Sequence, residues 1–206
     1  THQGDFRVTS TMFSKEIREC TVGILGCGRI GLTTAKLFKG LGAKVVGYDV
    51  YQSEAAKQIV EFLPLDEFLK QSDIISCHMP YIKGKNENFI NEEFISKMKD
   101  HAILVNTARG EVLDLEAAVK AIENNKLDGL AIDVIANEKS LFFKNFENGK
   151  MDTPLHQKLI DLYPRILITP HIASSTDKAL NDMIEVSLQN MNEYLNTDKC
   201  KNSLIK

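Results

Sequence analysis

Short runs of hydrophobic residues alternate with longer amphipathic segments along most of the chain. Six such runs predict strands at residues 21–25, 43–49, 72–78, 101–108, 127–134 and 165–171. Several of them contain uninterrupted aliphatic side chains, which is typical of parallel strands buried on both faces. The segments between them predict helices at residues 28–41, 65–71, 91–98, 115–124 and 154–162. This alternation predicts an α/β fold of Rossmann type, a doubly wound parallel sheet with helices on both faces.

Two segments depart from this alternation. Residues 175–195 carry apolar side chains at helical spacing, which predicts one long terminal helix. Residues 136–154 form a long irregular segment in which Phe142, Phe143 and Phe146 stand among polar residues. Irregular segments of this length inside a compact domain are usually functional or contact a partner.

A glycine-rich loop joins the first predicted strand to the first predicted helix. Gly26, Gly28 and Gly31 have the spacing G-x-G-x-x-G, which lets a bare backbone approach a pyrophosphate at a helix N-terminus. Asp49 ends the second strand, where a carboxylate can accept hydrogen bonds from both ribose hydroxyls. An acid at this position favours NAD over NADP because it repels a 2′-phosphate. Asp49 can also be read as a simple turn residue.

Polar clusters follow four further strands, where a doubly wound sheet places its ligand crevice. They are Cys77–Pro80, Asn106–Gly110, Ile132–Val134 and Thr169–His171. Taken singly, each has a structural interpretation: His78 as a hydrogen-bonded histidine, Arg109 as a surface charge and Asp133 as a cap. Together they predict one site at the carboxyl edge of the sheet.

Composition narrows the classes of ligand. The 206-residue chain is 43% hydrophobic and has a formal net charge of −3, which favours a globular fold and small ligands over nucleic acid or a membrane surface. Its four cysteines are scattered without a C-x-x-C pair, which favours reduced thiols in a cytoplasmic protein. We expect no metal site.

Taken in order and spacing, several motifs resemble those of the D-isomer-specific 2-hydroxyacid dehydrogenases. The motifs are VGILGCGRIG, VVGYD, HMP, INEEFISKMKDHAILVNTARGEVLD, AIDV followed by Glu138, and ITPHIA. The resemblance runs from about Phe6 to the C-terminus. The aromatic segment LFFKNFENG resembles the D-lactate and D-2-hydroxyglutarate dehydrogenase branch of the family.

The resemblance implies three catalytic residues. Arg109 looks like the arginine that binds the substrate carboxylate and polarises the ketone, and His171 looks like the proton donor. Glu138 looks like the carboxylate that hydrogen-bonds the histidine. A guanidinium fits a carboxylate in a bidentate pose, and a carboxylate beside an imidazole favours the charged imidazolium.

The resemblance also implies an NAD site. The three glycines and the Arg29–Ile30 backbone would lie at the pyrophosphate, Asp49 at the ribose, and Asp133, Thr107 and Ala108 at the nicotinamide. The remaining cofactor residues come from the segment after the third predicted strand: His78, Met79, Pro80 and Asn86.

The family has a second domain over the substrate, and we expect this chain to lack the N-terminal part of it. We therefore predict an interdomain remnant at residues 1–19, a dinucleotide-binding domain at 20–174, and a terminal helix and tail at 175–206. A homodimer formed through the cofactor domain is implied by resemblance only. Two alternatives remain: a non-catalytic NAD-binding module or inactive fragment, and a fold that binds another nucleotide or nucleic acid, which Asp49 and the acidic balance disfavour.

Overall fold

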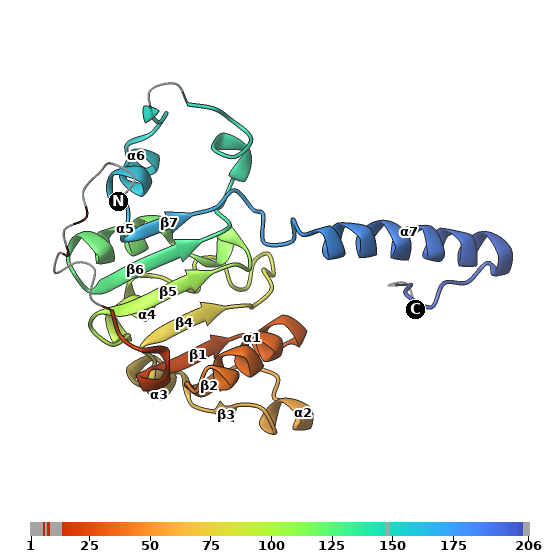
Figure 1. The fold of residues 1–206 in the computed structure, drawn as a ribbon, viewed down its shortest axis with the longest axis horizontal. Coiled ribbons are helices and arrows are strands. Elements are labelled where there is room, and N and C mark those ends of the chain that lie inside the picture. Colours follow the sequence, from red (N-terminus) through yellow and green to blue (C-terminus); the bar gives the residue numbers. More distant parts are fainter. Residues whose placement is uncertain (1–5, 7, 9–13, 147–148, 204–206) are drawn as a thin grey trace. The chain divides into compact units, whose positions relative to one another are not determined.

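The computed structural model describes residues 6, 8, 14–146 and 149–203, and within them a single parallel sheet dominates the fold. Its seven strands lie in the order β3-β2-β1-β4-β5-β6-β7 (Figure 1). Their bounds are β1 (Thr21–Leu25), β2 (Lys44–Tyr48), β3 (Glu61–Phe62), β4 (Ile74–Cys77), β5 (Ala102–Asn106), β6 (Leu127–Ile132) and β7 (Ile166–Ile168). Because the order runs outward from β1 and β4 in both directions, the sheet is doubly wound, which confirms the predicted fold class.

Helices cover both faces of this sheet. The described helices are α1 (Arg29–Gly40), α2 (Glu54–Lys57), α3 (Leu65–Gln71), α4 (Glu92–Lys97), α5 (Leu115–Glu123), α6 (Pro154–Asp161) and α7 (Asp177–Thr197). The chain runs along the sheet from β1 towards β3 and, in the opposite direction, from β4 towards β7. Because the connections between parallel strands are right-handed, α1 lies on one face of the sheet and α4, α5 and α6 lie on the other. The core is divided accordingly: a small cluster around Val22, Ile24 and Ala35 lies under α1, and a larger one around Phe68 and Leu104 lies on the other face.

The helix starts follow from capping side chains in the sequence. Asn91, Asp114 and Thr153 each accept a hydrogen bond from the amide three residues further on, at the starts of α4, α5 and α6. Ser53 caps α2 in the same way. Helix α2 and strand β3 were not predicted, because four helical residues and two strand residues are too few to show a hydrophobic period.

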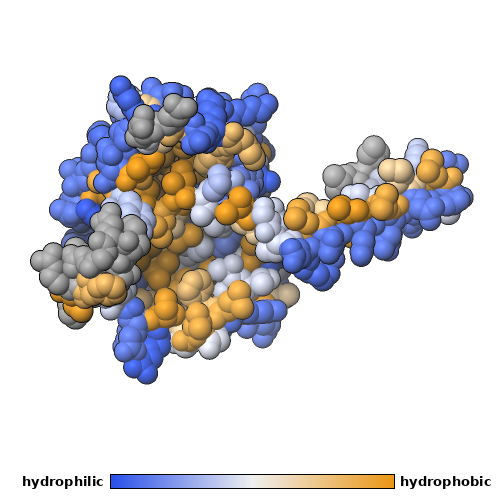
Figure 2. Space-filling model, turned by 45° about the horizontal axis from the view of Figure 1, so that its top comes forward, coloured by the Kyte–Doolittle hydropathy of each residue, from blue (hydrophilic) through white to orange (hydrophobic). Residues whose placement is uncertain are grey.

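The chain divides into two compact units, one ending at Pro170 and the other beginning at His171. In the second unit, α7 confirms the predicted long helix, and none of its residues is buried. Figure 2 shows apolar side chains along one side of the helix. The exposed apolar residues of α7 include Leu180, Ile184 and Leu188. Among the described residues, no helix combines the length and the apolar character that crossing a membrane requires. The predicted segment 1–19 lies largely outside the described residues, and its division from 20–174 and 175–206 stays a prediction.

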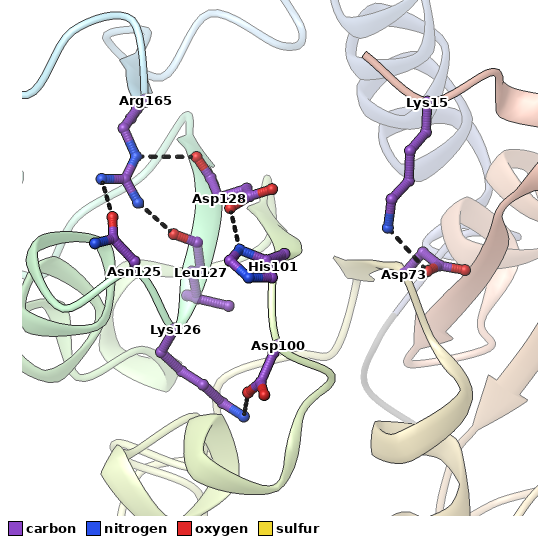
Figure 3. Close-up of polar contacts among 9 residues, drawn as sticks. All are labelled: Lys15, Asp73, Asp100, His101, Asn125, Lys126, Leu127, Asp128 and Arg165. Atoms are coloured by element: carbon purple, nitrogen blue, oxygen red, sulfur yellow. Dashed lines mark hydrogen bonds and ion pairs between the residues drawn. The ribbon is translucent and has the colours of Figure 1, made fainter. Parts of the chain in front are cut away.

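The amino ends of the strands are held together by polar side chains (Figure 3). At one point Asp73, just before β4, accepts hydrogen bonds from the Thr21 amide at 2.9 Å and the Lys99 ammonium at 2.7 Å. The Lys15 ammonium approaches the same carboxylate at 3.4 Å. At another point Arg165 donates to the Leu127 carbonyl at 2.7 Å, which ties the start of β7 to β6. These contacts lie at the opposite edge of the sheet from the polar strand-end clusters.

Replacing Asp73 with asparagine is expected to lower the free energy of unfolding by about 1–2 kcal/mol at neutral pH, because charge-assisted hydrogen bonds are lost. Burial raises the pKa of Asp73, but Lys99, the Thr21 amide and Lys15 outweigh it and lower the pKa overall. The folded pKa is thus depressed, and the charge contributes stability that is fully present above the unfolded pKa of about 3.9. This stability is lost as pH falls through the lower folded pKa.

Urea unfolding of both proteins between about pH 7 and pH 2 checks this prediction. The difference between wild type and Asp73→Asn should shrink at the acid end. Asp66→Asn is a matched control, because the Asp66 side chain is 62% exposed in its ion pair with Lys97. A difference that stayed constant with pH would show that packing, and not charge, makes Asp73 important.

Candidate functional site

The glycine loop between β1 and α1 combines two crowded glycines with an open one. Gly26 has φ +94°, and a Cβ there would lie 2.6 Å from the Met79 amide nitrogen. A Cβ on Gly31 would lie 2.0 Å from the Gly26 carbonyl oxygen. Gly28 is exposed at the N-cap of α1, and a Cβ there would meet nothing within 4 Å. The first and third glycines are therefore needed for packing, whereas Gly28 leaves the helix N-terminus open to a phosphate.

Gly31→Ala is expected to lower the free energy of unfolding by about 1–3 kcal/mol and to weaken NADH binding, because the loop backbone must move away from the new methyl group. Gly40→Ala is the matched control on the same helix, since a Cβ there has open space. Replacing a helical glycine with alanine should be neutral or stabilise by up to about 1 kcal/mol. Urea unfolding and NADH calorimetry on both variants test the pair. Equal effects would contradict the role given to Gly31.

Asp49 connects the end of β2 to the glycine loop. Its Oδ2 accepts a hydrogen bond from the Cys27 amide at 2.7 Å, and its Oδ1 accepts one from the Tyr51 amide at 2.9 Å. Each carboxylate oxygen can accept a further bond, so the half-buried side chain can still accept ribose hydroxyls. Burial, followed by the Asp49 charge, raises the pKa of the Cys27 thiol to about 12, which keeps this thiol protonated and unreactive.

A cavity of about 340 Å³ opens beyond the carboxyl ends of β4 and β5, beside the glycine loop. It brings together seven residues predicted for the site: Ile30, His78, Met79, Pro80, Thr107, Ala108 and Arg109. Tyr81 also lines it and was missed, although its position directly after Pro80 could have suggested it. The Tyr81 hydroxyl donates to Glu87 at 2.8 Å. The cavity lies at the switch point of the sheet, where doubly wound folds bind their ligands.

His78 lines the cavity. Its Nε2 lies 2.9 Å from the hydroxyl of the buried Ser76. Burial lowers the pKa of His78. The imidazole is therefore uncharged at neutral pH and contributes a hydrogen-bonding surface with no positive charge.

The loop that carries Arg109 is organised by Asn106, which is fully buried at the end of β5. The Asn106 amide group donates to the Arg109 carbonyl at 2.9 Å, and its oxygen accepts from the Ala108 amide at 3.1 Å. The Arg109 side chain is exposed and donates from Nη1 to the Ala108 carbonyl at 2.6 Å. A guanidinium has five N–H donors, so most of its donors can still bind a carboxylate.

The Arg109 loop packs directly against the segment that leads to Glu138. A Cβ on Gly110 would lie 1.9 Å from the Ile135 carbonyl carbon and 2.2 Å from the Ala136 nitrogen. Only glycine permits this approach of two backbones. Glu138 follows two residues later, is half-buried, and begins the short 3₁₀ helix η4 (Glu138–Ser140). The fold therefore brings the segments of Arg109 and Glu138 side by side.

Asp133 is 4% exposed at the end of β6. Its Oδ1 accepts a hydrogen bond of 2.5 Å from the hydroxyl of Thr169, just after β7. Thr169 stabilises this buried carboxyl group, and the TPH cluster was the signal that could have revealed this role.

Asn86 is not among the residues that line the cavity. Asn86 braces the turn after β4, where its oxygen accepts from the Ile82 amide and its nitrogen donates to the Pro80 carbonyl, both at 2.7 Å. His171 is exposed, has φ +52°, and is the first residue of the second compact unit. Its hydrogen bond with Glu138 therefore stays a prediction.

Several known sequences, and one family model, are similar to this chain. The family model described as D-isomer specific 2-hydroxyacid dehydrogenase, NAD binding domain, matches residues 1–173. The chain is 41% identical to a D-lactate dehydrogenase of Treponema pallidum, over 95% of this chain and 59% of that protein. It is 37% identical to an aromatic 2-oxoacid reductase of Clostridium sporogenes, over 92% of this chain and 57% of that protein.

Solved structures of D-lactate dehydrogenases are also similar to this chain. A D-lactate dehydrogenase with NAD⁺ from Lactobacillus jensenii superposes with a TM-score of 0.90 at 34% identity, covering 100% of this chain and 61% of that one. A D-lactate dehydrogenase from Aquifex aeolicus, complexed with NAD and lactic acid, has a TM-score of 0.84 at 38% identity, covering 96% of this chain and 60% of that one. The chain thus spans about three fifths of the length of these relatives.

Proposed function

Because this chain belongs to the D-isomer-specific 2-hydroxyacid dehydrogenase family and carries its NAD-binding domain, we propose that it serves an enzyme that reduces a 2-oxo acid to a D-2-hydroxy acid. The observation that carries the proposal is the position of Arg109. Arg109 is exposed and lines the cavity that also contains Thr107 and Ala108, two of the residues expected beside the nicotinamide. A cation in that place can hold the substrate carboxylate while the ketone faces the cofactor.

The reaction needs a hydride, a proton and a fixed substrate pose. NADH supplies the hydride when it is bound. Arg109 orients the substrate through its carboxylate and polarises the ketone, because a guanidinium is planar and always charged. His171 donates a proton to the developing alkoxide, and Glu138 orients the imidazole and favours its protonated form.

The cofactor residues have separate tasks in this proposal. The open N-terminus of α1, with Gly28 and the backbone of Arg29 and Ile30, binds the pyrophosphate. Asp49 binds the adenosine ribose, and Asp133 lies at the nicotinamide. The end of β4 and the Thr107–Ala108 pair form the walls of the groove between them.

The proposed substrate is a small 2-oxo acid. The activities named for the relatives differ in the side chain of that acid. The test is NADH oxidation by a polypeptide that contains these 206 residues together with the region that the relatives add. Pyruvate, 2-oxoglutarate and phenylpyruvate are the three probes, and the product of each is resolved by chiral chromatography. At least one is expected to give a D-2-hydroxy acid. NADH binding without turnover of any probe would favour a non-catalytic binding module.

We also propose a cytoplasmic homodimer that associates through the cofactor domain. The described cysteines are free thiols, which supports a reducing compartment. Sedimentation at several concentrations tests the dimer, and a monomer at all of them would contradict it.

A further inference from the structure

Asn106 connects several parts of the proposed site from one buried position. Its side chain is fully buried at the end of β5, and both of its polar atoms bind the loop that follows. Its backbone carbonyl accepts the Asp133 amide at 3.0 Å, which joins the ends of β5 and β6. Asn106 therefore contacts two residues expected at the nicotinamide, Ala108 and Asp133. It also contacts Arg109, which is expected at the substrate carboxylate.

The two side-chain hydrogen bonds of Asn106 require an amide group. The nitrogen donates to the Arg109 carbonyl at 2.9 Å, and the oxygen accepts from the Ala108 amide at 3.1 Å. An aspartate in the same place could accept from Ala108 but, when ionised, could not donate to Arg109. A leucine could do neither. The buried position makes both bonds matter, because a buried backbone group that loses its partner is unfavourable.

The loop is also fixed on the far side of Arg109. Gly110 approaches Ile135 so closely that a Cβ on the glycine would lie 1.9 Å from the Ile135 carbonyl carbon. The backbone of Arg109 is thus fixed through its neighbours on both sides. Its side chain bonds to the same loop, at the Ala108 carbonyl. The position of the guanidinium in the cavity therefore follows the backbone that Asn106 fixes.

We propose that Asn106 is a positioning residue for the reduction, which sets the guanidinium of Arg109 relative to the cavity wall formed by Ala108. This inference rests on the proposed function, because that function assigns the substrate carboxylate to Arg109. The carboxylate and the nicotinamide must meet in one geometry for hydride transfer. A misplacement of about 1 Å in such a site can cost about 10²-fold in rate.

Asn106→Leu removes both hydrogen bonds while the side chain still branches at the same carbon. In a polypeptide that contains this chain and the region that the relatives add, it should lower kcat/KM for the 2-oxo acid by about 30- to 100-fold. NADH affinity, measured by calorimetry, should fall much less. Asn91→Leu is the matched control, because it removes an asparagine oxygen that accepts the Phe94 amide at 2.9 Å at the start of α4. Its kcat/KM should stay near that of wild type.

A double-mutant cycle distinguishes positioning from a general loss of stability. In an Arg109→Ala background, Asn106→Leu should lower kcat/KM by no more than about 3-fold, because the side chain that it positions is gone. Equal losses in both backgrounds would overturn the proposal. Asn106→Asp, which keeps the acceptor for Ala108, goes through the same cycle if Asn106→Leu does not fold.

NMR of this chain tests the positioning without turnover. The Nε–H resonance of Arg109 should shift or broaden in Asn106→Leu and stay in place in Asn91→Leu. An unchanged resonance in folded Asn106→Leu would overturn the proposal. A wild-type polypeptide that reduced none of the three 2-oxo acids would contradict the proposed function instead. The NMR comparison would still decide whether Asn106 positions Arg109.

Discussion

His171→Ala is expected to reduce turnover by between about 10²- and 10⁴-fold while leaving NADH affinity within about 2-fold of wild type, the range that general acid catalysis by one side chain contributes. The physical reason is that the proposed imidazole gives a proton to the alkoxide and has no assigned contact with the cofactor. The assay is single-turnover and steady-state NADH oxidation, in a polypeptide that contains this chain and the region that the relatives add. NADH affinity is measured separately by calorimetry.

A matched histidine separates catalysis from stability. His101→Ala removes an exposed imidazole whose Nδ1 lies 2.8 Å from Asp128, at the opposite edge of the sheet (Figure 3). Its turnover should stay near that of wild type. If His171→Ala lost NADH affinity as strongly as turnover, the histidine would be a structural residue. If turnover survived, another group would have to supply the proton.

Asp49→Ala is expected to weaken NADH binding by about 10- to 100-fold and to remove most of the preference for NADH over NADPH. Hydrogen bonds to a charged group contribute roughly 1.5–3 kcal/mol, and the carboxylate that repels a 2′-phosphate is lost. Calorimetry with both cofactors on this chain measures the two effects. Substrate turnover is not needed.

Asp49 also accepts the Cys27 and Tyr51 amides, so the variant disturbs the loop as well as the ribose contact. Asp49→Asn distinguishes the two roles, since its amide oxygen can still accept one backbone amide while the negative charge is gone. It should relax the discrimination against NADPH with a smaller loss of NADH affinity. Glu67→Gln, an exposed acid on α3, controls for net charge. A wild-type chain that preferred NADPH would contradict the role given to Asp49.

Local signals in the sequence were sufficient for much of the fold. Helix α3 begins and ends where its period predicts, and α1, α4, α5 and α6 differ from the prediction by one residue at one or both ends. The first predicted strand coincides with β1, whereas the other five were too long at their carboxyl ends; β7, for example, ends at Ile168 and not at His171. The polar residues after a strand have no hydrophobic period of their own, so the sequence cannot separate the end of a strand from the loop that carries the site.

The cofactor and catalytic roles of the predicted site residues stay predictions. The cavity brings together Ile30, His78 and Arg109 from three separate segments, as strand-end clusters in a parallel sheet suggest. The role of the fully buried Asn106 in organising the Arg109 loop was not predicted. In the sequence, this asparagine cannot be distinguished from any other polar residue at the end of a strand. Asn86 was predicted as a cofactor residue, and the two hydrogen bonds with which it braces a turn were not predicted.

The α/β class, the glycine spacing and the motifs of the family could be recognised in the amino-acid sequence alone, because each depends on residues close together along the chain. The strand order, the contact of Gly110 with Ile135 and the pairing of Asp133 with Thr169 became known from the folded structure. Each of these depends on which distant segments pack together. Many tertiary arrangements are compatible with one local hydrophobic pattern, and packing between distant segments selects one of them. These contacts therefore cannot be predicted from local sequence alone.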